Sequence, residues 1–199
     1  MLYTSLMQAP VKILKSSLRI PPQSLEAEMA LLGSIMLRPE GMSDVSDFVN
    51  PEAFYSERHR MIFRAMQELF TKNQPIDLIS LTSCLREKNQ LEQVGGASYI
   101  TELVNIVPSS ANIIHYAQIV QKKSIMRNLI DASEYMSNLG FDETGDVEDL
   151  IDKVEKKIFA EIDSAVETYK KIGLFDELDD RFEDPDAAAA VAAGGGTGE

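Results

Sequence analysis

The stretch from Asn112 to Leu139 most constrains the fold, because it contains neither glycine nor proline and its apolar residues recur at helical spacing. It predicts one uninterrupted α-helix, which Gly140 ends. At 1.5 Å per residue this helix would be about 42 Å long. The preceding segment, 22–107, would form a head only about 30 Å across. The helix therefore extends beyond the head, and the projecting part of its apolar stripe needs another partner.

A second amphipathic segment supplies that partner. Asp146 has the residue type of a helix N-cap, and the apolar residues after it recur every three or four positions. The sequence thus predicts an antiparallel hairpin of helices 112–139 and 146–166, joined by a short connector. Two helices alone leave part of both stripes in water, which predicts self-association. The expected interface residues are Ile113, Tyr116, Val120, Leu129, Leu150, Val154, Ile158 and Ile162.

The segment before the hairpin has the pattern of several shorter helices. Two apolar stripes begin at Leu25 and Met61, Asp77 is placed to cap a third helix, and Gly95-Gly96 predicts a turn before a short apolar segment. Alternation of period two, the mark of a half-buried strand, does not occur. The predicted fold class is all-α: a compact helical head, a projecting antiparallel helical hairpin and an acidic flexible C-terminal tail.

These patterns divide the chain into four parts. We expect a flexible N-terminal arm (1–20), a globular helical head (21–109), a dimerising helical hairpin (110–167) and a linker-like acidic segment with an Ala/Gly-rich tail (168–199). Pro21-Pro22 ends the arm, because proline cannot sit inside a helix.

Charge favours proteins over nucleic acids as partners. The chain of 199 residues has a net charge of -13, and residues 174–199 hold eight acidic side chains against one basic. Such a surface gains little from counterion release around phosphates, so we expect weak or no DNA binding by this chain alone. The acidic segment carries four apolar residues near helical spacing, which would suit docking on a basic-rimmed groove of a partner. The alternative is a solvated tail that keeps the chain in solution. The four residues are Leu174, Phe175, Leu178 and Phe182.

Composition excludes several classes of site. One cysteine excludes an intramolecular disulfide, and two histidines with one cysteine exclude a Cys/His zinc cluster. No apolar run reaches the roughly 20 residues of a membrane span. The first twenty residues lack the pattern of a signal peptide. These observations predict a cytoplasmic protein without a membrane partner.

No residue combination predicts catalysis. The glycines near the C-terminus are not followed by lysine, so no phosphate-binding loop is encoded. His59 and His115 are interpreted as packing or surface residues, and Cys84 as a small core residue. Glu26 and Glu28 are interpreted as helix-start and surface charges. We therefore predict no catalytic, cofactor-binding or metal-binding residue in this chain.

Several stretches together resemble the N-terminal domain of the bacterial replicative DNA helicase of DnaB type. The similarity lies in order along residues 19–163, with a Glu-Ala-Glu helix, a Pro-Ile-Asp cap, a Gly-Gly-x-x-Tyr turn and a Pro-Ser-x-x-Asn helix entry. The individual stretches are 19–37, 51–69, 74–85, 91–130 and 154–159.

The resemblance implies a role in DNA replication within the primosome. In that family the domain is a helical head with a hairpin; hairpins pair, and the pairs form a trimer-of-dimers collar on a hexameric ring. The implied partners are further copies of the chain, primase and a helicase loader. ATP and Mg²⁺ belong to a RecA-like motor domain that this sequence lacks, so the chain should be inactive alone. The alternative is a stand-alone collar homologue that co-assembles with a helicase hexamer and regulates it.

Overall fold

The computed structural model describes residues 20–107, 112–141 and 146–171, and within these ranges the chain is helical without any strand. The predicted all-α class is therefore confirmed. Residues 1–19 of the expected arm and residues 172–199 of the expected tail lie outside this description. The described elements are α1 (Leu25–Leu37), α2 (Gly41–Ser46), the 3-10 helix η1 (Pro51–Ala53), α3 (Glu57–Thr71), α4 (Leu78–Glu87), α5 (Gly96–Ile106), α6 (Ile113–Gly140) and α7 (Val147–Lys171).

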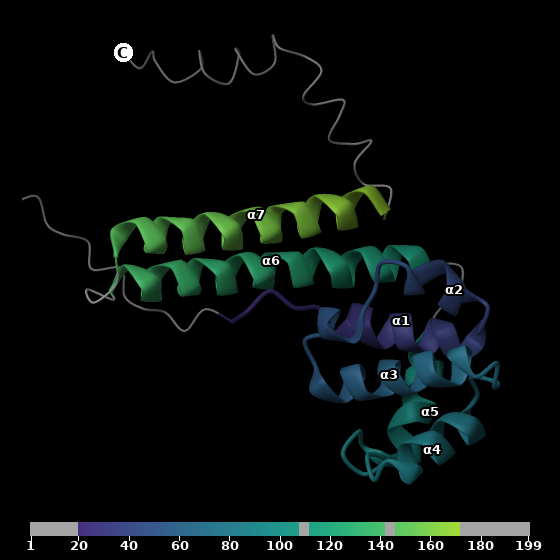
Figure 1. Cartoon of the computed structure of the whole chain (residues 1–199). Coiled ribbons are helices and arrows are strands. Elements are labelled where there is room, and N and C mark those ends of the chain that lie inside the picture. Colours follow the sequence, from purple (N-terminus) through teal and green to yellow (C-terminus); the bar gives the residue numbers. More distant parts are fainter. Residues whose placement is uncertain (1–19, 108–111, 142–145, 172–199) are drawn as a thin grey trace, which may run out of the picture.

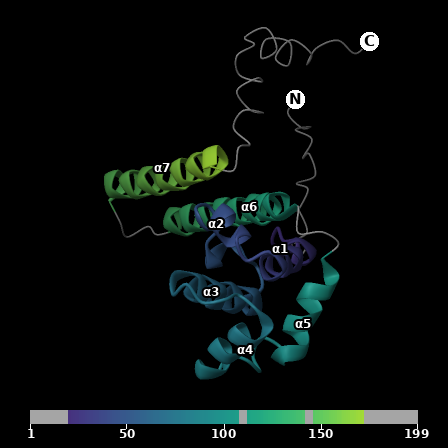
Figure 2. The ribbon, with the colours of Figure 1, turned by 90° about the vertical axis from the view of Figure 1, so that its right-hand side faces the viewer.

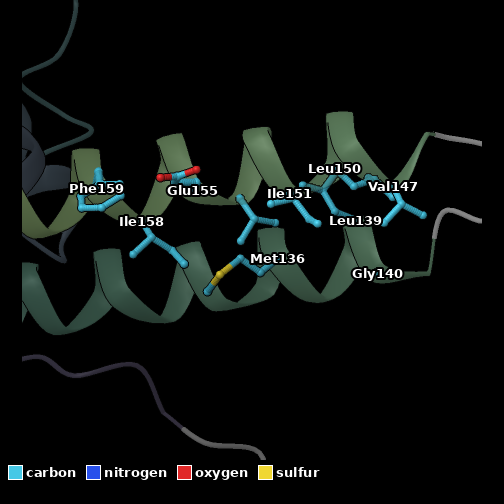
Figure 3. Close-up of a pocket in the computed structure, with 10 residues that line it drawn as sticks. Met136, Leu139, Gly140, Val147, Leu150, Ile151, Glu155, Ile158 and Phe159 are labelled. Carbon is cyan, nitrogen blue, oxygen red and sulfur yellow. The ribbon is translucent and has the colours of Figure 1, made fainter.

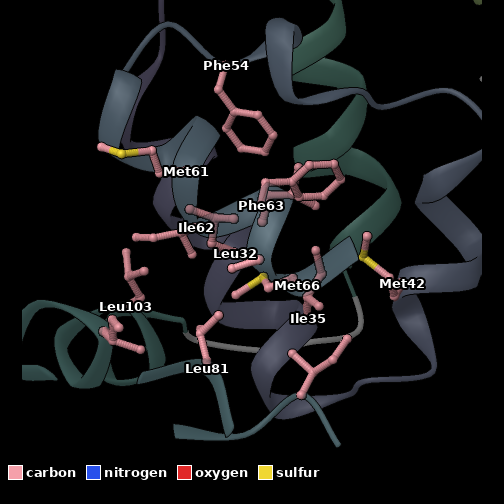
Figure 4. Packing of buried hydrophobic residues seen from close by; sticks show 14 of the residues in the cluster. Leu32, Ile35, Met42, Phe54, Met61, Ile62, Phe63, Met66, Leu81 and Leu103 are labelled. Carbon is pink, nitrogen blue, oxygen red and sulfur yellow. The ribbon is translucent and has the colours of Figure 1, made fainter. Parts of the chain in front are cut away.

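The head is built around α1, which packs against α3, α5 and α6 (Figures 1 and 2). Its apolar side chains and those of α3 and α4 form one continuous core, part of which is visible in Figure 4. Local caps fix the helix starts: Ser24 Oγ accepts a hydrogen bond from the N–H of Ala27 at 3.4 Å, and Asp77 accepts one from Ser80 at 2.8 Å. Gly95 forms the predicted turn with a φ of +101°, a conformation that glycine adopts without strain.

The long helix α6 belongs both to the head and to the hairpin. Ile113, Ala117 and Val120, in its first turns, are buried in the head core. The remainder runs antiparallel to α7 and extends past the head (Figure 1). The predicted hairpin is therefore present, and both ends of its first helix lie within one residue of the predicted boundaries. Helix α7 has no buried side chain among its 25 residues.

The helices α1 and α5 approach so closely that Gly33 has no room for a side chain. A Cβ atom added there would lie 2.1 Å from the carbonyl oxygen of Leu103 and 2.4 Å from Cγ2 of Val107. We therefore expect Gly33→Ala to lower the free energy of unfolding by about 1–3 kcal/mol, because α5 must shift. Chemical denaturation followed by circular dichroism measures the loss.

Gly140 provides the matched control for that substitution. A Cβ atom added at Gly140 would meet no atom within 4 Å. Gly140→Ala should leave stability unchanged or raise it by up to about 1 kcal/mol, as alanine favours a helix. Equal effects of the two substitutions would contradict the close packing at Gly33.

Candidate interaction surface

An apolar groove of about 400 Å³ lies between the projecting ends of α6 and α7 (Figure 3). It forms because two helices facing each other cannot cover the flanks of both apolar stripes. Among the described residues that line it, Glu155 alone carries a charge. The lining residues are Met136, Leu139, Gly140, Val147, Leu150, Ile151, Val154, Glu155, Ile158 and Phe159.

The groove exposes large apolar side chains to water. The exposed fractions are 66% for Val147, 60% for Ile151 and 57% for Phe159. Helix periodicity continues this surface toward Ile162 on α7, and Leu129 is exposed on α6, each at 46%. A contiguous apolar surface of this kind marks an interaction site on a soluble protein. We call the groove-lining residues together with Ile162 the hairpin face.

The structure divides the eight interface residues that the sequence predicts. Leu150, Val154 and Ile158 are half-buried and line the groove, and Ile162 is exposed one turn farther along α7. Leu129 is exposed on α6 but lines a separate, mostly polar cavity. The other three are placed elsewhere, which corrects the prediction: Ile113 and Val120 are buried in the head core, and Tyr116 packs against it.

Val147, Ile151 and Phe159 were missed as candidates for the interface, although they are the most exposed large apolar residues of the groove. The sequence marks them by a second apolar series on α7, which is offset by about one residue from the positions of α7 that face α6. Leu174, Phe175, Leu178 and Phe182, the predicted docking residues of the tail, lie outside the described residues.

A second site, which is polar, lies inside the head and joins α1, α3 and α5. Glu28 Oε2 lies 2.6 Å from Nδ1 of His59, whose Nε2 lies 2.7 Å from the hydroxyl of Tyr99. The Glu28 carboxyl also accepts hydrogen bonds from the backbone N–H groups of Tyr55 and Ser56, at 2.6 Å and 3.3 Å. Glu28 is only 2% exposed, so its interpretation as a surface charge was wrong. His59 is fully buried, in agreement with a packing role.

The geometry assigns a structural role to this network. With its proton on Nδ1, His59 donates to Glu28, and its Nε2 accepts the hydroxyl proton of Tyr99, so each group has a partner. Burial raises the pKa of Tyr99, and the guanidinium of Arg58 lies 4.1 Å from the centre of its ring. Because Glu28 and His59 are enclosed by the core, the network holds helices together and presents no open site to a substrate.

Arg127 fixes the hairpin to the head. Its Nη1 donates to the carbonyl of Pro22 at 2.8 Å and its Nη2 to the carbonyl of Ala53 at 2.6 Å. The guanidinium also lies 5.8 Å from the ring centre of Tyr55. Burial lowers the pKa of Arg127, so the hydrogen bonds must offset part of a desolvation cost.

Arg127→Lys should lower the free energy of unfolding by about 1.5–3 kcal/mol, because one ammonium cannot replace a planar fork between two carbonyls. Thermal and urea denaturation measure the change. Lys122→Arg, at an exposed position of the same helix, is the control and should be neutral. Wild-type stability of the Arg127→Lys variant would show that the hydrogen bonds from Arg127 to the two carbonyls contribute nothing to the free energy of unfolding.

Other classes of site are not found in the part of the chain that the structure describes. There, no three His, Cys, Asp or Glu side chains gather in a way that could hold a metal ion. None of the described helices is both long and apolar enough to cross a membrane.

Comparison with protein families gives one match across the head and the start of α6. The family model described as the DnaB-like helicase N terminal domain matches residues 20–122.

Two curated relatives match a longer part of the chain. The replicative DNA helicase DnaC of Bacillus subtilis is 43% identical over 140 residues, which are 70% of this chain and 31% of that protein. The replicative DNA helicase DnaB of Geobacillus stearothermophilus is 38% identical over 162 residues, 81% of this chain and 35% of that protein. The chain thus spans about a third of the length of these relatives.

Solved structures show the same arrangement of helices. The crystal structure of the N-terminal domain of DnaB helicase from Mycobacterium tuberculosis superposes with a TM-score of 0.68 at 31% identity, covering 71% of this chain and 99% of that one. A structure described as a DnaB-like replicative helicase and its interactions with primase gives a TM-score of 0.55 at 28% identity, covering 67% and 31%.

Proposed function

Because the chain belongs to the family of DnaB-like helicase N-terminal domains, we propose that it is the self-associating collar module of a replicative DNA helicase. The exposed hairpin face is the observation that carries this proposal. Pairing two hairpins would remove the groove from water, and three such pairs would form a closed ring of six domains. Closed symmetry uses the apolar surface without leaving a free end for further growth.

The same collar would dock primase. One structural relative is described with its primase interactions, and that description supports the same class of partner here. A helicase loader is a further candidate partner. ATP and Mg²⁺ enter only through the motor of a complete helicase, and the present residues are assigned no nucleotide site.

Sedimentation velocity with primase from the same organism tests the docking role. At about 10 µM of each protein, where a complex of micromolar affinity forms, we expect a faster boundary that contains both proteins. Separate boundaries at every ratio would contradict primase docking. Mixed assembly with an intact helicase, together with loss of unwinding, would instead favour the regulatory homologue.

A further inference from the structure

The projecting part of α6 has a second exposed face, opposite to α7. Arg127, Ile130 and Glu134 follow one another at steps of three and four residues, and so lie along one line of α6. Phe141, the C-cap of the helix, follows seven residues after Glu134. Ile130 is 43% exposed and Phe141 is 83% exposed. We call this line, with the neighbouring Asp131, the outer face of α6.

The chain leading into α1 already lies on the beginning of the outer face. The carbonyl of Pro22 is bonded to Arg127, and one turn farther along α6 the cavity of about 600 Å³ is lined by Ile20, Pro21, Ile130 and Glu134, among others. Followed backwards from α1, the chain therefore advances along α6 toward its projecting end. Figure 1 shows this segment passing beneath α6.

The outer face is acidic where the chain arrives. Asp131 and Glu134 are exposed, and neither forms an ion pair with another described residue. The basic side chains that line the same cavity already have hydrogen-bond partners. Arg127 donates to two backbone carbonyls, and Arg60 donates to the carbonyl of Phe54 at 2.8 Å. An occupant with basic and apolar side chains would complement this surface.

We propose that residues 11–19 of the same chain dock on the outer face of α6. This segment directly precedes Ile20 and has three basic and no acidic side chains. Its cations recur at steps of three and four residues, and so does an apolar series, so that both sets would lie on adjacent faces of a helix. The cations are Lys12, Lys15 and Arg19, and the apolar series is Val11, Leu14 and Leu18.

Length and charge agree with this occupant. Nine residues as a helix measure about 13 Å, and the part of α6 from Asp131 to Gly140 measures about 15 Å. The basic series would meet Asp131 and Glu134, while the apolar series would cover Ile130 and Phe141. Docking of the arm would then leave the hairpin face as the exposed apolar surface for a second copy.

Hydrogen exchange of the backbone amides in residues 11–19 of the full chain tests the proposal. We expect exchange about tenfold slower than that of an unstructured chain. The double variant Asp131→Asn, Glu134→Gln should lose about fivefold of this protection, because it removes the charges without changing side-chain shape. The control Asp163→Asn, Glu167→Gln makes the same changes on exposed positions of α7 and should retain full protection.

Three results would overturn the inference. These are exchange at the unstructured rate in the unmodified chain, protection that is unaffected by the α6 double variant, and protection that falls on dilution. The last result would mean that the arm of another copy occupies the face. The measurement needs neither primase nor a helicase ring, so its failure is distinguishable from failure of the proposed function.

Discussion

Replacing Glu28 by alanine should lower the free energy of unfolding by about 3–5 kcal/mol, which is much of the stability of a domain this size. The carboxyl accepts bonds from His59 and from the backbone N–H groups of Tyr55 and Ser56. Alanine would leave the buried His59 donor and two part-buried backbone N–H groups without this acceptor, and it would open a small cavity. Urea denaturation followed by circular dichroism measures the loss.

Two further variants serve as comparisons for Glu28→Ala. Glu28→Gln keeps the volume and one acceptor oxygen, so its loss should be smaller, about 1–2 kcal/mol. Glu26→Ala removes an exposed carboxylate from the same helical turn and should change stability by less than about 0.5 kcal/mol. If Glu28→Ala were as mild as Glu26→Ala, the buried network would not hold α1, α3 and α5 together.

Charging the hairpin face should strongly weaken self-association. Val154 and Ile158 lie on α7, are half-buried and line the groove between α6 and α7. A second hairpin would cover this groove. An aspartate at either position would be buried without a partner, at a cost of several kcal/mol. We therefore expect Val154→Asp and Ile158→Asp each to weaken association by about a hundredfold or more. Sedimentation equilibrium measures the association constants.

Ala160→Asp is the matched control, since it places the same charge on an exposed position of α7 that does not line the groove. It should associate as the unmodified chain does. Circular dichroism must show equal helix content in all three variants. Unchanged association of properly folded Val154→Asp and Ile158→Asp variants would place the interface elsewhere.

The helices were predictable because their signals are local. The segment from Asn112 to Leu139 lacks any residue that breaks a helix, and the observed α6 runs from Ile113 to Gly140. Asp77 also acts as the predicted cap, because capping depends on the next three residues alone. The end of α7 was placed five residues early, because the apolar series used to predict that helix stops at Ile162.

The burial of Glu28 depends on distant residues. An acidic side chain in a first helical turn suits the helix dipole, and that local pattern favours a surface position. Its partner His59 lies 31 residues along the chain, and Tyr99 lies 40 residues beyond His59. Only the packing of α1 against α3 and α5 brings these groups together.

The error at Ile113 and Val120 has a similar origin. Periodicity shows which side of α6 is apolar, but it does not show what covers that side. The head covers the first turns, and α7 covers the projecting part. The sequence therefore predicted the stripe correctly and assigned its first third to the wrong contact.

The central claim is that the hairpin face joins copies of this chain. Light scattering coupled to size exclusion, over a concentration series of the unmodified chain, tests it most directly. We expect the mass to rise from the monomer of 22.1 kDa to that of a dimer, and of larger even-numbered assemblies at higher concentration. A strict monomer up to tens of micromolar would contradict the claim.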